Sequence, residues 1–326
     1  LPAMQDAARL PLPGWALALF TLGCVDYQVE RRPNIDSWTQ PSRDSGVDIL
    51  WVVDNSCSMS EEQEQLGLHA TSFVSFLSNA AVDFRLVVTT TDPDPKSLPF
   101  DYDPVTMTAD TADLATVFAA AVEVGTEGDR DERGFDFALE ALTEHADLRK
   151  GADLEIVFFS DEDDYSEIGP IAFVNELQAM RPGKAIAVNA VVGDLPEGCA
   201  SLLAAADAGV RYIDAQEESG GLRESICSSD YAALLERIAL KVLGLERRFA
   251  LSEVPELDTL EVRVDDAIIP NRERHGWVYD PGNNWVVFDG YAVPPPGSTV
   301  SLSYFPWLGD LNASGDSGAD SGVETP

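Results

Sequence analysis

The chain has 326 residues, which is long for one domain and suits one large domain with a smaller one. Hydrophobic residues make up 45% of it, an ordinary share for a protein with a packed core. Its 57 acidic and 21 basic side chains give a formal net charge of -36. A surface of that sign repels phosphate backbones, so we expect no nucleic-acid partner. We interpret most of the acidic surplus as a contribution to solubility. Affinity for divalent cations is the alternative interpretation.

Residues 1–24 have the features of an export signal. Arg9 supplies a positive charge, and the apolar run 14–24, GWALALFTLGC, is too short to span a bilayer but suits the core of a signal peptide. The run resembles a bacterial lipoprotein signal, in which the cysteine after Leu-Gly becomes lipidated. This resemblance predicts a lipid on Cys24 and a membrane anchor, with the protein exported to the cell envelope, the outer membrane or beyond. An ordinary cleaved signal and a buried amino-terminal segment are the alternatives.

The polar segment that follows gives way abruptly to an apolar one. Residues 25–46 contain Pro and Ser and show little periodicity, which predicts a linker. The run 47–53, VDILWVV, is almost continuously apolar and ends at Asp54, which is typical of a strand buried on both faces. The next segment, 61–80, has acids in its first turn and apolar residues at helical spacing, which predicts a helix.

Strands and helices keep alternating as far as residue 245. The alternation predicts a doubly wound, mostly parallel α/β sheet, with helices on both faces, over residues 47–245. Ligands of such sheets gather at the carboxyl ends of the strands. Further strands are expected at 83–91, 154–161, 185–193 and 210–215, and further helices at 112–124, 134–142, 172–180 and 229–245.

The pattern changes again after Arg248, where apolar and polar residues alternate. This period of two, interrupted by the turn-forming segments DPGNN and VPPPGS, predicts a small, antiparallel all-β domain over 246–308. Residues 309–326 have almost no apolar side chains around which to fold, so we expect a disordered acidic tail. The aromatic residues expected in or near the core of the β domain are Trp277, Trp285 and Phe288.

The segment 52–60, VVDNSCSMS, combines one carboxylate with two hydroxyls at the end of a predicted strand. Hard cations such as Mg²⁺ take oxygen ligands, and Asp54, Ser56 and Ser58 supply part of such a set. Asp-x-Ser-x-Ser after a hydrophobic strand resembles the metal-ion-dependent adhesion site (MIDAS) of von Willebrand factor type A (VWA) domains. The resemblance covers roughly residues 47–245 and implies a Rossmann-like sheet of the kind already predicted. The alternative is a VWA scaffold whose serines only cap the first helix.

The resemblance also implies ligands from two later places in the chain. A later central strand of VWA domains ends in a ligand aspartate, and Asp161 in IVFFSDEDD occupies that place. A threonine from an intervening loop should join it, for which Thr126 is our choice. Asp131, Glu132 or water could take this role instead, and Thr89–Thr91 are more remote candidates. The family arrangement implies that hydroxyls touch the ion directly while the aspartates act largely through water.

The four cysteines fit an exported protein. Cys24 is accounted for by lipidation, and a disulfide between Cys199 and Cys227 is predicted. Cys57 then stays a free thiol between two ligand serines. The Cys and His spacings of zinc sites are absent from the sequence.

Taken with the resemblance, these features predict a binding protein and not an enzyme. The implied function is metal-dependent protein binding or adhesion at the cell surface, with Mg²⁺, or else Mn²⁺ or Ca²⁺, as the ion. The implied partner is a protein that presents an acidic side chain. One alternative is a structural subunit of an envelope or matrix assembly, in which the ion only stabilises the fold. A metal-dependent hydrolase is a more distant one, because no base, nucleophile and oxyanion donor can be placed together.

Overall fold

The computed structural model describes residues 31–80, 82–92, 106–128, 131–144, 148–201 and 205–309. The predicted signal, the predicted lipidation site at Cys24 and nearly all of the predicted tail lie outside these residues. Within the described part of the chain, no helix has both the length and the apolar character needed to cross a membrane.

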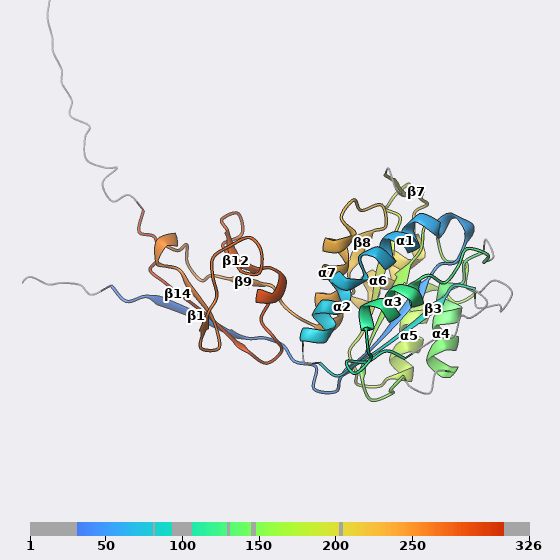
Figure 1. Cartoon of the computed structure of the whole chain (residues 1–326), viewed down its shortest axis with the longest axis horizontal. Coiled ribbons are helices and arrows are strands. Elements are labelled where there is room, and N and C mark those ends of the chain that lie inside the picture. Colours follow the sequence, from blue (N-terminus) through green and yellow to red (C-terminus); the bar gives the residue numbers. More distant parts are fainter. Residues whose placement is uncertain are drawn as a thin grey trace, which may run out of the picture. The chain divides into compact units, whose positions relative to one another are not determined.

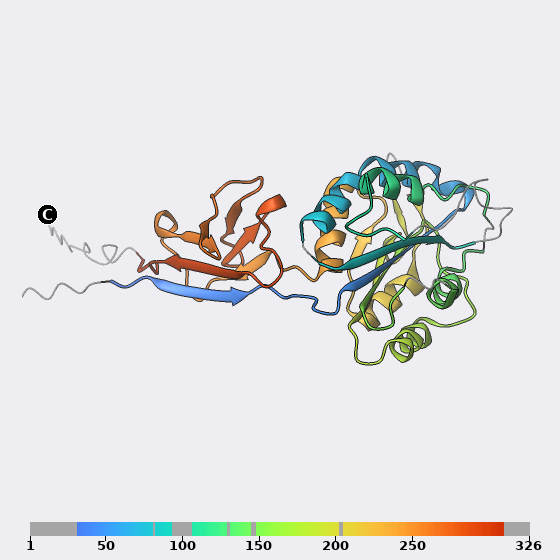
Figure 2. The same cartoon turned by 60° about the horizontal axis from the view of Figure 1, so that its bottom comes forward.

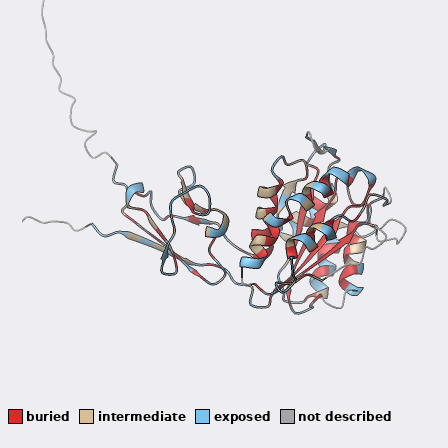
Figure 3. Cartoon of the chain, viewed as in Figure 1, coloured by how far each residue is buried: buried red, intermediate tan, exposed pale blue. Residues whose placement is uncertain are grey.

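The central feature is a five-stranded sheet in which every pair of neighbours is parallel (Figure 1). The middle strands are almost wholly buried, which explains why their sequences are continuously apolar (Figure 3). The prediction of a doubly wound α/β fold is therefore confirmed. In spatial order the strands are β3 (Phe84–Thr90), β2 (Val47–Val53), β4 (Asp153–Phe159), β5 (Ile186–Val192) and β8 (Arg223–Ser225).

Helices cover both faces of this sheet (Figure 2). Successive side chains of β2 divide between two hydrophobic clusters, so that Trp51 faces one layer of helices and Leu50 the other. On the first face, the Trp51 ring meets Phe73 and Phe118 edge-on at centroid distances of 5.3 and 5.5 Å. The first face carries α1 (Ser60–Leu68), α2 (Ala70–Asn79), α3 (Leu114–Val122) and α7 (Tyr231–Leu243), and the second carries α4 (Gly134–Glu144), α5 (Pro170–Met180) and α6 (Val210–Ser219).

One predicted strand is wrong. Residues 210–215 begin helix α6, and the edge strand of the sheet is β8 instead. The side chains of Tyr212, Ile213 and Ala215 are all buried. A strand would turn residues 212 and 213 to opposite faces, whereas a helix turns all three toward the sheet. The segment was too short for its apolar period to distinguish the two.

The β region consists of two antiparallel sheets that share one hydrophobic cluster. Trp277 and Phe288 are buried in it, while Trp285 is half-buried. The first sheet has the order β1 (Asn34–Thr39), β14 (Thr299–Tyr304), β10 (Glu261–Val264) and β11 (Ala267–Ile268), and the second has β12 (Trp277–Asp280), β13 (Trp285–Phe288) and β9 (Arg248–Ala250).

Strand β1 corrects the expectation of a linker over residues 25–46. All six of its residues pair with β14, so the α/β region is inserted between β1 and β9 of the β region. The inward face of β1 includes Asp36, whose carboxylate accepts a 2.8 Å hydrogen bond from the Tyr304 hydroxyl, while Ile35 is exposed. This reversal of polar and apolar positions explains why the segment has no strand-like hydrophobic pattern. Trp38 packs edge-on against Phe249 at 5.7 Å.

Candidate metal centre

Two aspartates lie at the carboxyl edge of the parallel sheet. Asp54 follows β2 directly, and Asp161 comes two residues after β4. Strands β2 and β4 are hydrogen-bonded neighbours, so the two carboxyl groups emerge at the same edge. Both side chains are buried, with 0% of Asp54 and 4% of Asp161 exposed. The sheet topology therefore brings together two residues that are far apart in the sequence.

Three hydroxyl groups surround these carboxylates. One Asp54 oxygen accepts a 2.7 Å hydrogen bond from the Ser56 backbone N–H, and the other accepts a 2.6 Å bond from the Ser160 hydroxyl. The hydroxyl oxygens of Ser56 and Ser58 lie 3.1 Å apart. Burial is the main reason that the pKa of Asp54 is raised, and the bond from Ser160 partly offsets it. Ser160 was not expected from the sequence, where its only sign is its position just before Asp161.

Asp161 is also held in an environment that disfavours its negative charge. Burial and then repulsion by Asp54 raise its pKa to about 6, against the lowering effect of a hydrogen bond with Ser58. Its Oδ1 atom is buried and has no hydrogen-bond partner. A buried carboxylate oxygen without a partner is expensive to maintain, which indicates a group or ion that binds there.

The loop that carries Thr126 lies beside Asp54. The Gln63 side chain donates 2.8 Å hydrogen bonds to the carbonyl oxygens of both Asp54 and Gly125. The Gly128 N–H donates to the Asn55 carbonyl at 2.8 Å, and a Cβ on Gly128 would come within 2.5 Å of the Asn55 side chain. Thr126 itself is half-buried, and its hydroxyl makes no side-chain hydrogen bond within the described residues.

Two further acids are buried at the same edge. Glu132 is 1% exposed, and neither of its carboxylate oxygens makes a hydrogen bond of normal geometry. Burial and then repulsion by Asp54 raise its pKa to about 9, and the nearby Thr91 hydroxyl offsets this only partly. Glu62 is 2% exposed, and burial, with weaker repulsion by Asp161, raises its pKa to about 7.

Asp131 and the threonines at the end of β3 are placed less favourably for an ion. Asp131 is exposed. The Thr91 hydroxyl donates to the Asn55 side-chain oxygen at 3.4 Å, and the Thr90 hydroxyl is buried without a partner. Thr89 is buried at the end of β3.

The donor set at this edge fits a hard divalent cation. In the described part of the chain, no Lys or Arg forms an ion pair with Asp54, Glu62, Glu132 or Asp161, all of which are buried. Buried like charges without a cation repel one another, and oxygen atoms are the ligands that Mg²⁺ and Ca²⁺ take. No three His, Cys, Asp or Glu side chains of the described residues form a metal cage by themselves. Hydroxyls and water must therefore complete any coordination.

A disulfide forms part of the surface beside this edge. Cys199 and Cys227 are bonded as predicted, and Cys57 is an exposed free thiol. Cys199 belongs to a small hairpin, β6 (Cys199–Ala200) and β7 (Ala205–Ala206), whose Asp207 N–H donates a 2.8 Å bond to the Asp161 carbonyl. A hollow of about 360 Å³ is lined by Ser58, Asp161, Glu162, Cys199, Ala205, Ala206 and Asp207.

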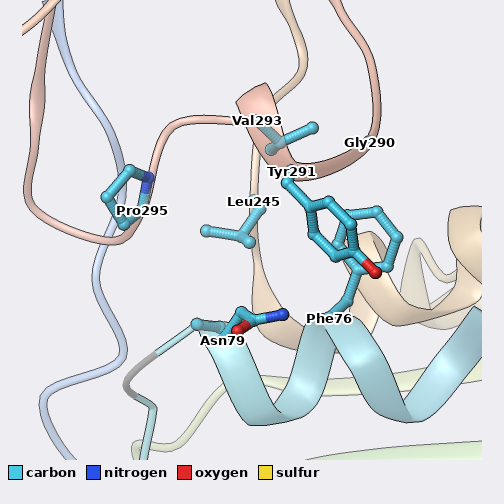
Figure 4. A pocket seen from close by; sticks show the side chains of 8 residues that line it. Phe76, Asn79, Leu245, Gly290, Tyr291, Val293 and Pro295 are labelled. Atoms are coloured by element: carbon cyan, nitrogen blue, oxygen red, sulfur yellow. The ribbon is translucent and has the colours of Figure 1, made fainter. Parts of the chain in front are cut away.

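Another hollow, of about 270 Å³, contains none of the candidate ligands (Figure 4). Its wall is largely apolar, with Phe76 of α2 and Tyr291 of the short helix η3 (Gly290–Ala292) facing Leu245. The chemistry of the carboxyl edge therefore does not extend to this hollow. Its lining residues are Phe76, Asn79, Ala80, Leu245, Gly290, Tyr291, Val293 and Pro295.

Comparison with known proteins adds a structural likeness only. No family model matches the sequence, and a search of curated proteins finds no match. Among solved structures, the pilus adhesin SpaC from Lactobacillus rhamnosus GG in its open conformation matches at 13% identity and a TM-score of 0.44, over 84% of this chain and 41% of the adhesin. A von Willebrand factor type A protein from Catenulispora acidiphila matches at 12% identity and a TM-score of 0.42, over 86% of this chain and 67% of that one.

A third match is proximal thread matrix protein 1 from the mussel byssus, with a zinc-occupied MIDAS motif. It has 12% identity and a TM-score of 0.39, over 63% of this chain and 47% of that protein. The chain resembles VWA proteins. At these identities and scores the likeness concerns the backbone fold and gives no information about individual side chains. The metal-site assignment therefore rests on the side chains of the carboxyl edge alone.

Proposed function

We propose that this chain is a metal-dependent protein-binding module, in which a divalent ion at the carboxyl edge of the sheet engages an acidic side chain of a partner protein. The observation that carries the proposal is the group formed by Asp54, Ser56, Ser58 and Asp161. Asp54, Ser56 and Asp161 are buried, the hydroxyl oxygens of Ser56 and the exposed Ser58 lie 3.1 Å apart, and no cation of the described residues pairs with either carboxylate. The adjoining hollow gives a partner access to Ser58 and Asp161.

The neutral ligands of this group explain why an ion there would attract an outside carboxylate. Ser56 and Ser58 offer hydroxyl oxygens that carry no charge, and Asp54 and Asp161 act largely through water in the arrangement that we propose. The ion would therefore keep much of its positive charge and supply an electrophilic point for an acidic side chain. Mg²⁺ is our choice, and Mn²⁺ or Ca²⁺ take the same kind of donors.

A structural role for the ion is the second candidate. The burial of Glu62 and Glu132 beside the two aspartates favours it, because an ion that relieves their repulsion stabilises the fold without any partner. We place a hydrolase third, since nothing in the sequence places a base, a nucleophile and an oxyanion donor together.

The disulfide supports an exported protein, because such bonds persist in oxidising compartments. We further propose that residues 1–24 are the export signal and that lipidation of Cys24 anchors the chain to a membrane. In the domain scheme that we propose, residues 47–245 form the binding domain. The β region, β1 together with residues 246–308, serves as a spacer or second contact.

Calorimetry with MgCl₂ on the full chain tests the metal site. We expect one bound ion for the wild type and none for Asp54→Asn, which keeps the shape of the side chain but removes its charge. Glu176→Gln is a matched control, because Glu176 is exposed on α5. Equal Mg²⁺ binding by the wild type and Asp54→Asn would sink the site assignment.

The partner is tested separately by panning carboxylate-bearing extracellular proteins on immobilised chain, in Mg²⁺ and then in EDTA. We expect captured protein to be released by EDTA and to be lost with Asp54→Asn. Binding that ignores EDTA would leave the metal site in place but remove its role in recognition.

A further inference from the structure

Glu132 is the one acid at the carboxyl edge, among the described residues, with both carboxylate oxygens buried and without a normal hydrogen bond. It lies in the same intervening loop as Thr126, from which the Asp-x-Ser-x-Ser pattern led us to expect a hydroxyl ligand. Thr126 is half-buried. The Glu132 side chain, in contrast, is 1% exposed, and its carboxylate form is costly to bury without a cation beside it.

The backbone fixes Glu132 at the centre of the edge. The Tyr165 N–H donates to the Glu132 carbonyl at 2.6 Å, and the next residue, Arg133, donates its N–H to the Thr91 carbonyl at 3.4 Å. Thr91 follows β3 and Tyr165 lies in the loop after β4, so residue 132 is held between the ends of the two strands that flank β2. Among charged groups, Asp54 accordingly contributes most to raising the pKa of Glu132, after burial itself.

The start of α4 holds this position rigidly. Asp164 accepts the Phe135 N–H at 3.1 Å, and Arg211 pairs with Asp164 at 2.9 Å. A Cβ on Gly134 would come within 2.4 Å of the Tyr212 hydroxyl, so α4 must begin at this glycine to fit against α6. The residues on the carboxyl-terminal side of Glu132 therefore leave its side chain little freedom to turn away from the edge.

We infer that Glu132, and not Thr126, supplies the third loop group to the ion, which then lies among three acidic side chains: Asp54, Glu132 and Asp161. The inference rests on the proposed metal site. Because these carboxylates do not form a cage by themselves, at least one of them acts through water. Glu132 contributes a charge where a threonine contributes none.

The additional charge changes how the ion behaves. Sites with more acidic ligands bind divalent ions more tightly, and Ca²⁺ accepts more oxygen ligands than Mg²⁺. The site therefore holds its ion more firmly than one built on two carboxylates. An incoming acidic side chain also meets a site whose three carboxylates outweigh the ion's charge. A partner suited to it carries a basic group close to its carboxylate.

Calorimetry with Mg²⁺ and with Ca²⁺ on the full chain separates the two loop residues. We expect Glu132→Gln to weaken binding of both ions by about 10- to 100-fold, and Thr126→Val to leave the dissociation constants almost unchanged. The opposite result, with binding lost in Thr126→Val and kept in Glu132→Gln, would overturn the inference while the metal site stands. Failure of the wild type to bind either ion would overturn the site itself, and with it the inference.

The melting temperature gives a readout that does not depend on a partner. In EDTA, Glu132→Gln should melt close to the wild type, because glutamine keeps the size and shape of the buried side chain. In saturating Mg²⁺ the wild type should melt higher than the variant, because it binds the ion more tightly. A variant that melts lower than the wild type in both conditions, with unchanged ion affinity, would show that Glu132 has only a packing role. Thr126→Val controls for changes in the loop and should follow the wild type in both conditions.

Discussion

A buried aspartate lies at each end of strand β2, and the two have different partners. Asp48, near its amino end, and Asp54, just past its carboxyl end, are both 0% exposed. Asp48 receives a 2.9 Å ion pair from Arg149 and a 3.1 Å ion pair from Arg181. Asp54 receives hydrogen bonds from Ser56 and Ser160 and, within the described residues, no cation.

The same contrast holds for the neighbouring acids. At the amino end of β4, Arg43 pairs with Asp153 at 3.2 Å and also with Glu155. At the carboxyl edge, Glu62, Glu132 and Asp161 have no basic partner among the described residues. A chain that pairs its buried acids with arginine at one end leaves them unpaired at the other, which is what a site for an outside cation requires.

Breaking the ion pair between Asp48 and Arg181 should have the largest effect on stability. Asp48→Ala leaves Arg181 buried without its partner, so we expect the free energy of unfolding to fall by about 3–5 kcal/mol. Urea denaturation measures the loss, with Glu176→Gln as the control. Mg²⁺ binding by the folded fraction should be unchanged, because Asp48 lies at the far edge. A loss as small as that of the control would contradict the role we give to this pair.

Adding Mg²⁺, the cation that we propose for the carboxyl edge, should have the next largest effect on stability. A ligand that binds only the folded state stabilises it by mass action, so Mg²⁺ at 100 times its dissociation constant should add about 2.7 kcal/mol. Urea denaturation with and without EDTA measures the gain. Asp54→Asn should abolish it, and Asp48→Ala, if it folds, should keep it. The same gain in Asp54→Asn would remove the distinction between the two edges.

The hydroxyl groups should matter less than the carboxylates. Ser56→Ala and Ser58→Ala each remove one neutral oxygen that water can partly replace, so we expect each to weaken Mg²⁺ binding by about 1 kcal/mol. Ser160→Ala loses the 2.6 Å bond that orients Asp54, and a similar effect is expected. Calorimetry measures all three variants, and Ser75→Ala on the exposed side of α2 is the control. If any of these variants lost as much Mg²⁺ binding as Asp54→Asn, the hydroxyls and not the carboxylates would be the main ligands of the ion.

The smallest effect is the pH dependence of stability that Glu155 causes, near the amino ends of the parallel strands. Burial raises the pKa of Glu155 from 4.5 to about 7 even though Arg43 opposes the shift, so the folded chain keeps this proton at higher pH than the unfolded chain does. The contribution of Glu155 to stability is therefore full below pH 4.5 and falls as the pH rises toward 7. Glu155→Gln should flatten this part of the stability curve equally in Mg²⁺ and in EDTA. A flattening seen only in EDTA would mean that the two edges are coupled.

The α/β fold and the paired aspartates could be predicted because their signals are local. Continuous apolar runs mark β2 and β4, and an aspartate follows each of them. Strand β1 could not be predicted, since its inward face carries Asp36 and its partner β14 lies at the other end of the chain. The burial of Glu132 was equally invisible, because an acid in a polar loop has the sequence appearance of a solvated residue. Only the positions of Thr91 and Tyr165 show that this loop passes over the sheet edge.

The insertion of the α/β region after β1 has a mechanical consequence. Tension between a ligand at Asp54 and an attachment on the amino-terminal side of Asn34 would run through the covalent backbone of β1, residues 40–46 and β2. Only the part of the force that enters through Asp161 must pass from β4 to β2. These strands pair at seven positions, and a force along the strands loads all seven pairs together in shear. Pulling of this kind would bypass α4 to α7 and the other strands of the β region, so that the molecule could transmit force without first unfolding.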